Sequence, residues 1–204
     1  TLEVKINYLA PALSGALRAE ACVVSRSRRV AVMEARVYDE AQRLYDELAK
    51  GIVERAEAMR LGPGWELDTD VGPVINKAAL EKIHSYTQIG KDEGAELLTG
   101  GEIASEGDLA KGFYYRPTVF GGVQPDMRIA QEEIFGPVLS LISIKDEAEA
   151  VRVSNGIRYG LSSSIFTRDV NRAFRAMRDL EAGITYVNAG TIGAEVHLPF
   201  GGVK

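Results

Sequence analysis

The feature that most constrains the fold is an alternation of strand-like and helix-like segments from residue 29 onward. Apolar and β-branched runs predict strands, and apolar residues at helical spacing predict helices. The predicted strands are 29–33, 96–99, 114–120, 138–144, 163–167 and 184–188, and the predicted helices are 37–53, 76–94, 146–155 and 169–183. Strands that alternate with helices need crossover connections. The sequence therefore predicts an α/β fold, with a mostly parallel sheet and helices packed on it.

Polar residues mark where several of these helices begin. Asn76, Asp146 and Asp169 each stand directly before a helical pattern, where their side chains can accept a hydrogen bond from an unpaired backbone N–H. Pro117 lies within the predicted strand 114–120. Because proline cannot donate to a strand ladder, it indicates an edge or a bulge there.

The first 28 residues differ from the rest. Residues 1–36 hold six Lys or Arg and three Asp or Glu, a net of +3, whereas the whole chain has a formal net charge of −5. Pro11 and Gly15 break any long helical pattern. The sequence predicts an irregular, degenerate N-terminal segment at 1–28 and one domain at 29–204.

Composition excludes several classes of function. The sequence pI of about 5.2 argues against a nucleic-acid partner, and no uncharged apolar stretch is long enough to span a membrane. The single cysteine, Cys22, cannot form an internal disulfide, and with two histidines it offers no zinc-binding cluster. We therefore expect a soluble cytoplasmic protein without a metal site.

Common phosphate-binding motifs are absent from the sequence. It contains neither a G-x-G-x-x-G loop nor a G-x-x-x-x-G-K-[ST] loop. His84 lies in the middle of a predicted helix, and we expect it to be a surface or half-buried helix residue.

One run of eight residues is far more specific. Gln131–Val138, Q-E-E-I-F-G-P-V, resembles a signature of the aldehyde dehydrogenase superfamily. Other elements follow in that family's order: Gly72-Pro73, Gly90, Gly94-Ala95, Gly100-Gly101, 116–120 (R-P-T-V-F), 159–161 (Y-G-L), Gly183, Val187-Asn188 and 199–202 (P-F-G-G). The resemblance covers about 29–204 and implies a catalytic domain without the cofactor-binding domain. Residues 89–94 (I-G-K-D-E-G) and 128–131 (R-I-A-Q) resemble the 1-pyrroline-5-carboxylate dehydrogenase-like members.

The resemblance implies oxidation of an aldehyde or semialdehyde to the acid, with NAD or NADP as the cofactor and a small-molecule aldehyde as substrate. Glutamate semialdehyde, which is in equilibrium with pyrroline-5-carboxylate, is one candidate. This chain is then a catalytic-domain fragment that we expect to be inactive in isolation and to bind no cofactor alone. The alternative is a degenerate, non-catalytic relative that acts as an interaction or assembly module.

Four site residues follow from the same resemblance. Glu133 matches the glutamate that holds the ribose hydroxyls of the nicotinamide nucleotide, and Phe135 matches an aromatic residue at the nicotinamide end. A capped turn leading into the next strand is the plainer interpretation of both. Gly193 and Ala194 match a loop whose backbone amides hold a substrate carboxylate, and an ordinary surface loop is the plainer interpretation there.

The family pattern is broken where the nucleophile and general base belong. Cys22 is the only candidate nucleophile, but it lacks the Gly-Gln context and stands too far before Tyr38. Glu3 is the candidate general base, yet it is too close to Cys22 in sequence for the helix that separates the two groups in the family. A small core thiol and a surface glutamate are the favoured interpretations.

Assembly also departs from the family. The β-hairpin and C-terminal strand through which its members associate are not recognisable here, so the usual dimer is not expected. An apolar face is expected to stay exposed where a cofactor domain would pack, which favours a homo-oligomer unlike that of the family.

Overall fold

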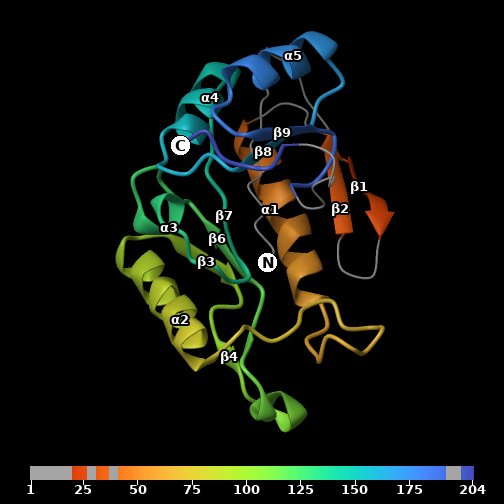
Figure 1. Cartoon of the computed structure of the whole chain (residues 1–204), viewed down its shortest axis with the longest axis vertical. Coiled ribbons are helices and arrows are strands. Elements are labelled where there is room, and N and C mark those ends of the chain that lie inside the picture. Colours follow the sequence, from red (N-terminus) through yellow and green to blue (C-terminus); the bar gives the residue numbers. More distant parts are fainter. Residues whose placement is uncertain (1–19, 27–30, 37–40, 192–198) are drawn as a thin grey trace.

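The computed structural model of the chain describes residues 20–26, 31–36, 41–191 and 199–204, with side chains from Tyr45 onward. Figure 1 shows the arrangement of the elements. In chain order they are β1 (Glu20–Arg26), β2 (Ala31–Arg36), α1 (Ala41–Glu57), α2 (Lys77–Asp92), β3 (Glu96–Thr99), β4 (Ile103–Ala104), η1 (Gly107–Lys111, a 3-10 helix), β5 (Tyr114–Tyr115), β6 (Thr118–Gly121), α3 (Arg128–Gln131), β7 (Val138–Ser140), α4 (Glu147–Asn155), β8 (Ser162–Ile165), α5 (Val170–Asp179) and β9 (Ile184–Val187).

The centre of the molecule is the sheet β3–β6–β7, which lies between α1 and α2 (Figure 1). Successive residues of a strand face opposite sides of the sheet. Accordingly Val119 of β6 packs in a cluster with Ala49 and Ile52 of α1. Phe120 packs on the other side with Ile83 of α2 and its neighbours. All four residues of β6 are buried because a helix covers each face.

The α/β class is confirmed, and the strand pairing is mixed rather than mostly parallel. The pairs β6–β7 and β8–β9 are parallel, and their connections contain α3 and α5 respectively. The pairs β3–β6, β4–β5 and β1–β2 are antiparallel. Helical crossovers return the chain in the same direction, whereas a short connection such as that between β4 and β5 reverses it.

The predicted capping residues occupy their places. Asn76 Oδ1 accepts a hydrogen bond from Ala79 N at 2.8 Å, and Asp146 Oδ1 accepts one from Glu149 N at 2.7 Å. Asp169 Oδ1 accepts from Asn171 N at 2.8 Å. Each side chain satisfies a backbone donor that a helix leaves unpaired at its start.

Several element boundaries differ from the predictions. The predicted strand 114–120 is divided into β5 and β6, with Pro117 between them. β7 ends at Ser140 instead of residue 144, and α1 runs to Glu57 instead of residue 53. These ends depend on hydrogen bonds with neighbouring elements, which periodicity alone does not specify.

The N-terminal segment is not irregular throughout. Its residues Glu20–Arg26 form β1, which pairs with β2 in antiparallel register, Cys22 opposite Glu34. This corrects the prediction of an irregular 1–28. The β-branched residues Val23 and Val24 lie on this strand and favour extended structure. The prediction gave more weight to Pro11 and Gly15, which lie before the strand.

The C-terminal layer consists of α4, α5 and the pair β8–β9. Its hydrophobic cluster is small: the buried members are Ile165, Ala176 and Leu180, and Val151 and Val187 pack against them. A Cβ atom on Gly183 would collide with the carbonyl oxygen of Gly201. Only a glycine at position 183 therefore allows residues 199–202 to run so close to the start of β9.

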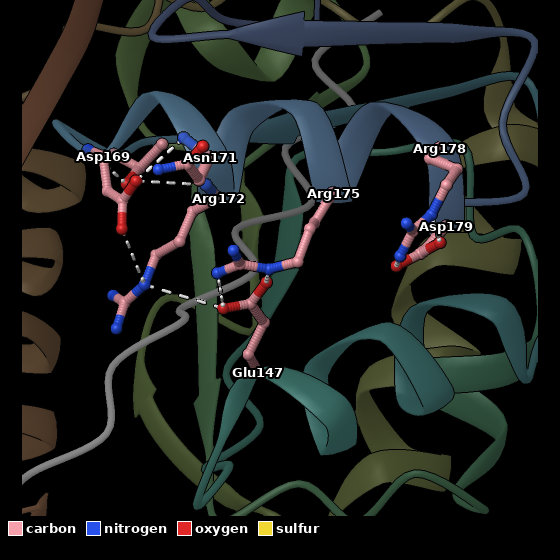
Figure 2. Close-up of polar contacts among 8 residues, drawn as sticks. Glu147, Asp169, Asn171, Arg172, Arg175, Arg178 and Asp179 are labelled. Atoms are coloured by element: carbon pink, nitrogen blue, oxygen red, sulfur yellow. Dashed lines mark hydrogen bonds and ion pairs between the residues drawn. The ribbon is translucent and has the colours of Figure 1, made fainter.

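Charged contacts join α4 to α5, as Figure 2 shows. Arg175 Nε and Nη2 donate to the two carboxylate oxygens of Glu147 at 2.8 and 2.9 Å. Arg172 Nε lies 3.6 Å from the same carboxylate. On the last turn of α5, Arg178 donates to both carboxylate oxygens of Asp179 at 2.6 and 2.8 Å. The hydrogen bonds from Arg175 lower the pKa of Glu147.

Candidate functional site

The segment that links α3 to β7 presents the two residues predicted to contact a nicotinamide nucleotide. Ile134 points into the core, where it is 9% exposed. Its neighbours Glu133 and Phe135 are both exposed, Phe135 to 57%. The sequence places both in one motif, and the structure confirms only that the two side chains are accessible from the surface.

Phe135 adopts an unusual backbone conformation. Its φ is 60°, in the left-handed region that residues other than glycine rarely occupy. Such a conformation costs on the order of 1–3 kcal/mol and persists only where neighbouring contacts impose it. The residues on both sides of Phe135 supply these contacts.

Gly136 and Pro137 fix the segment on its C-terminal side. A Cβ atom on Gly136 would lie 2.5 Å from Ile83 Cδ1, so this glycine lets the backbone pack directly on α2. The backbone N–H of Val138 donates to Gly136 O, and that of Thr118 donates to Pro137 O, each at 2.8 Å. β6 and α2 together therefore hold the exit from the turn.

Lys82 fixes the segment on its N-terminal side. Its Nζ donates to the backbone carbonyl of Glu133 at 2.7 Å. Within the described part of the chain, no side chain pairs with the Glu133 carboxylate. The backbone of Glu133 is thus held while its two acceptor oxygens stay available to hydroxyl groups of a ligand.

A charged cluster that the sequence analysis did not identify lies immediately before this segment. Glu132 Oε1 accepts from Arg128 Nε at 3.0 Å, and Oε2 accepts from Arg128 Nη2 at 3.0 Å. Tyr86 Oη donates to Oε2 of Glu132 at 2.5 Å. The hydrogen bonds from Arg128, and next those from Tyr86, lower the pKa of Glu132 to about 2. The hydrogen bond to Glu132 raises the pKa of Tyr86.

Within this cluster, only the pairing of Arg128 with Glu132 could be predicted from the sequence. Arg128 and Glu132 are four residues apart, a spacing that brings side chains together on a helix. Tyr86 lies 46 residues before Glu132, and no local pattern predicts their contact. Lys82 lies 51 residues before Glu133, and the same holds for that pair.

The structure does not describe the side chains of the other predicted site residues. Cys22 lies on β1, and its side chain is outside the described residues. Glu3, Gly193 and Ala194 lie outside the described residues altogether. His84 is exposed on α2, as predicted, with Nδ1 3.3 Å from Tyr115 Oη.

The described residues include neither a metal-binding cluster nor a membrane-spanning helix. They contain no group of three or more His, Cys, Asp or Glu side chains arranged to hold a metal ion. Among the helices that they form, none combines the length and apolar character needed to cross a membrane.

An open depression of about 630 Å³ lies along α5, far from the signature in sequence. Its lining includes Phe174, Arg175 and Arg178. Both arginines are paired with carboxylates, as Figure 2 shows. The depression therefore combines one aromatic ring with polar and paired charged groups, and none of the predicted site residues that the structure describes lines it.

Comparison with known families now bears on the exposed Glu133 and Phe135. A model of the aldehyde dehydrogenase family matches residues 28–204, most of the chain. The chain belongs to this family.

This aldehyde dehydrogenase chain aligns with about a third of the length of the relatives it matches. An α-ketoglutarate semialdehyde dehydrogenase from Haloferax volcanii is 43% identical over 161 residues, which are 79% of this chain and 33% of the relative. The crystal structure of HpcC from Thermus thermophilus is 46% identical with a TM-score of 0.75, and 80% of this chain covers 32% of that one. Betaine aldehyde dehydrogenase from Staphylococcus aureus, solved with NAD+, is 34% identical with a TM-score of 0.76, at 78% and 32% coverage.

A second family model matches the N-terminal region. Residues 1–45 match the thioesterase superfamily, and the two matches overlap at 28–45. Cys22 and Glu3 precede the aldehyde dehydrogenase match, which therefore lends them no support. The antiparallel pair β1–β2 lies wholly within the second match. The N-terminal segment is thus similar to a different family from the one to which the rest belongs.

Proposed function

We propose that this chain supplies the nicotinamide-ribose side of an NAD(P)-dependent aldehyde dehydrogenase, which oxidises an aldehyde or semialdehyde to the acid. The observation that supports this is the fixed turn at Glu133–Phe135, which leaves one carboxylate and one aromatic ring exposed inside the family signature. The carboxylate would accept hydrogen bonds from the ribose hydroxyls, and the ring would pack at the nicotinamide end. Bound NAD or NADP would accept the hydride from the aldehyde.

The chain spans about a third of the length of the relatives it matches, so complete activity is expected only together with the remaining parts of such an enzyme. A semialdehyde substrate agrees with the name of the Haloferax volcanii relative. Glutamate semialdehyde is the narrower candidate from the sequence resemblance and belongs in the same substrate panel. In this proposal Gly193 and Ala194 hold a substrate carboxylate, and the protein is cytoplasmic.

Cys22 and Glu3 are the candidate nucleophile and general base of this proposal, and the thiol can be tested directly. An activated thiolate reacts with an alkylating agent at pH 6, whereas an ordinary thiol of pKa near 8.5 reacts slowly there. Slow alkylation of Cys22 at pH 6 would remove it as the nucleophile.

A thermal-shift titration with NAD tests the cofactor site. A ligand present at ten times its Kd stabilises the native state by about 1.4 kcal/mol, which raises the Tm of a chain of this size by about 3–6 °C. The variant Glu133→Gln keeps the shape of the side chain, removes its charge and is expected to lose most of this shift. No shift at millimolar NAD would contradict cofactor binding by this chain alone.

A specific observation supports a second candidate function, that of a non-catalytic interaction or assembly module. The thioesterase match covers the region of both Cys22 and Glu3, so neither reactive group has the support of the aldehyde dehydrogenase match. This function predicts no NAD shift and no aldehyde turnover, either alone or with the missing parts of an aldehyde dehydrogenase supplied separately.

A further inference from the structure

We infer that Tyr86, Arg128 and Glu132 form a positioning cluster that, with Lys82, sets the conformation in which Glu133 and Phe135 face a nicotinamide nucleotide. This inference rests on the proposed function for its ligand, but the positioning itself is a property of the chain. In this inference none of the four residues is assigned a contact with the ligand. Each acts through the backbone of the segment that presents the two contact residues.

The first step is the bidentate ion pair in which Arg128 donates to both carboxylate oxygens of Glu132. We call such a pair a fork. Both carboxylate oxygens accept from the guanidinium at 3.0 Å, so the carboxylate is fixed in direction as well as in distance. Arg128 is in turn anchored, because its backbone N–H donates to Glu93 Oε2 at the end of α2 at 2.8 Å. The backbone N–H of Glu132 donates to Arg128 O at 2.8 Å. The start of the signature is therefore tied to α3.

The second step ties the same carboxylate to α2. Tyr86 Oη donates to Glu132 Oε2, and two cations lie near the Tyr86 ring. Arg128 Cζ is 5.5 Å from the ring centroid, and Lys82 Nζ is 5.7 Å from it. Both distances are in the range of cation–π attraction. One side chain of α2 therefore contacts the carboxylate, the arginine and the lysine together.

The third step is the set of contacts that hold the backbone around Glu133 and Phe135. Lys82, which the Tyr86 ring helps to place, donates to the Glu133 carbonyl at 2.7 Å. Ile134 is buried in the core, and Gly136 lies against Ile83 of the same helix. Contacts before, within and after the pair thus leave Phe135 in its left-handed conformation, at φ 60°. The cluster imposes a strained backbone at a ligand-facing position, where strain commonly serves binding.

Backbone NMR and amide hydrogen exchange on the whole chain, without any cofactor, test the positioning. Tyr86→Phe removes only the hydroxyl, and Glu132→Gln removes the charge that the fork requires. Either change is expected to raise exchange across 132–138 by about tenfold, because it weakens the hydrogen bonds that hold the start of this segment and so favours its local opening. The HN–Hα coupling constant of Phe135, which depends on φ, is expected to move toward the averaged value of an unrestrained backbone.

Tyr45→Phe is a matched control. Tyr45 Oη accepts from Gly122 N at 2.8 Å, so this variant also removes a tyrosine hydroxyl that holds a backbone group, but at a different turn. It is expected to leave the Phe135 coupling and the exchange of 132–138 unchanged. Arg128→Lys keeps the charge without the fork and is expected to give an intermediate effect.

The outcomes separate this inference from the proposed function. Unchanged Phe135 coupling and unchanged exchange in both Tyr86→Phe and Glu132→Gln would overturn the positioning cluster, whatever NAD does. If the coupling moves and the wild-type chain shows no NAD shift, the cluster stands and cofactor binding by this chain fails. If the chain binds NAD, Tyr86→Phe is expected to weaken binding several-fold and to lower Tm no more than Tyr45→Phe does.

Discussion

In two regions of this molecule an arginine donates hydrogen bonds to both oxygens of a glutamate carboxylate, and the surroundings of these two forks differ. The Arg128–Glu132 fork lies beside the largest core cluster, which includes Phe120 and Ile83. The Arg175–Glu147 fork joins α4 to α5 in a layer with only three residues in its buried cluster (Figure 2). The same kind of ion pair therefore has a different structural role in each region. The first fork fixes a short segment on an already rigid support, whereas the second supplements a layer with little apolar burial of its own.

Core substitutions give the largest expected difference between the two regions. Phe120→Ala is expected to lower the free energy of unfolding by about 4 kcal/mol, and Leu180→Ala by about 2 kcal/mol, the lower end for such changes because the layer around it can relax. Chemical denaturation of both variants measures the two losses. Equal losses would show that the C-terminal layer is as tightly packed as the central one.

Acid pH is expected to destabilise both forks, with a smaller effect on stability than the core substitutions. The pKa of Glu132 is lowered from 4.5 to about 2, so its pairing stabilises the folded state fully above about pH 5. That contribution is lost as the pH falls from about 4.5 toward 2, because the unfolded chain then binds a proton that the folded chain excludes. Glu147, whose pKa is also lowered, loses its contribution in the same direction.

Melting temperatures between pH 6 and pH 2.5 check this dependence. Glu132→Gln is expected to flatten the acid decline in part, and Glu147→Gln to flatten another part. Both pairs are partly exposed to solvent, so each change in the acid decline is expected to be small and to become smaller at high salt. If the variant with both substitutions loses as much Tm in acid as the wild type does, other carboxylates cause the acid sensitivity.

The smallest expected effect on stability comes from the exposed stripe on α5. Val170, Phe174 and Met177 are 62%, 65% and 52% exposed, and their spacing places them on one face of the helix. Phe174→Ser is expected to change stability by no more than about 0.5 kcal/mol. It is also expected to reduce self-association in light scattering and the binding of a hydrophobic dye.

Phe200→Ser is the control for this stripe, since Phe200 is 68% exposed and lies outside α5. A wild-type chain that is monomeric and binds no dye would contradict association through α5. An equal response of the two variants would assign the association to general hydrophobicity instead.

Much of the fold follows from local sequence signals. Asn76, Asp146 and Asp169 cap helices where the sequence predicts them, because a cap depends on a side chain and a backbone group only two or three residues away. The interruption at Pro117 follows from a missing N–H. The extent of β7 and the pairing of β3 with β6 depend on partners elsewhere in the chain, and there periodicity was insufficient.

The candidate site divides in the same way. The eight-residue signature by itself determined the family and the pair Glu133 and Phe135. Only the tertiary structure showed that Phe135 has a left-handed backbone and that Tyr86 and Lys82 reach the segment from α2. A motif states which residues are adjacent in sequence, but hydrogen bonds and ion pairs form between residues that folding brings within a few ångströms. Tyr86 and Glu132 are 46 positions apart in sequence, so their contact could be found only in the folded structure.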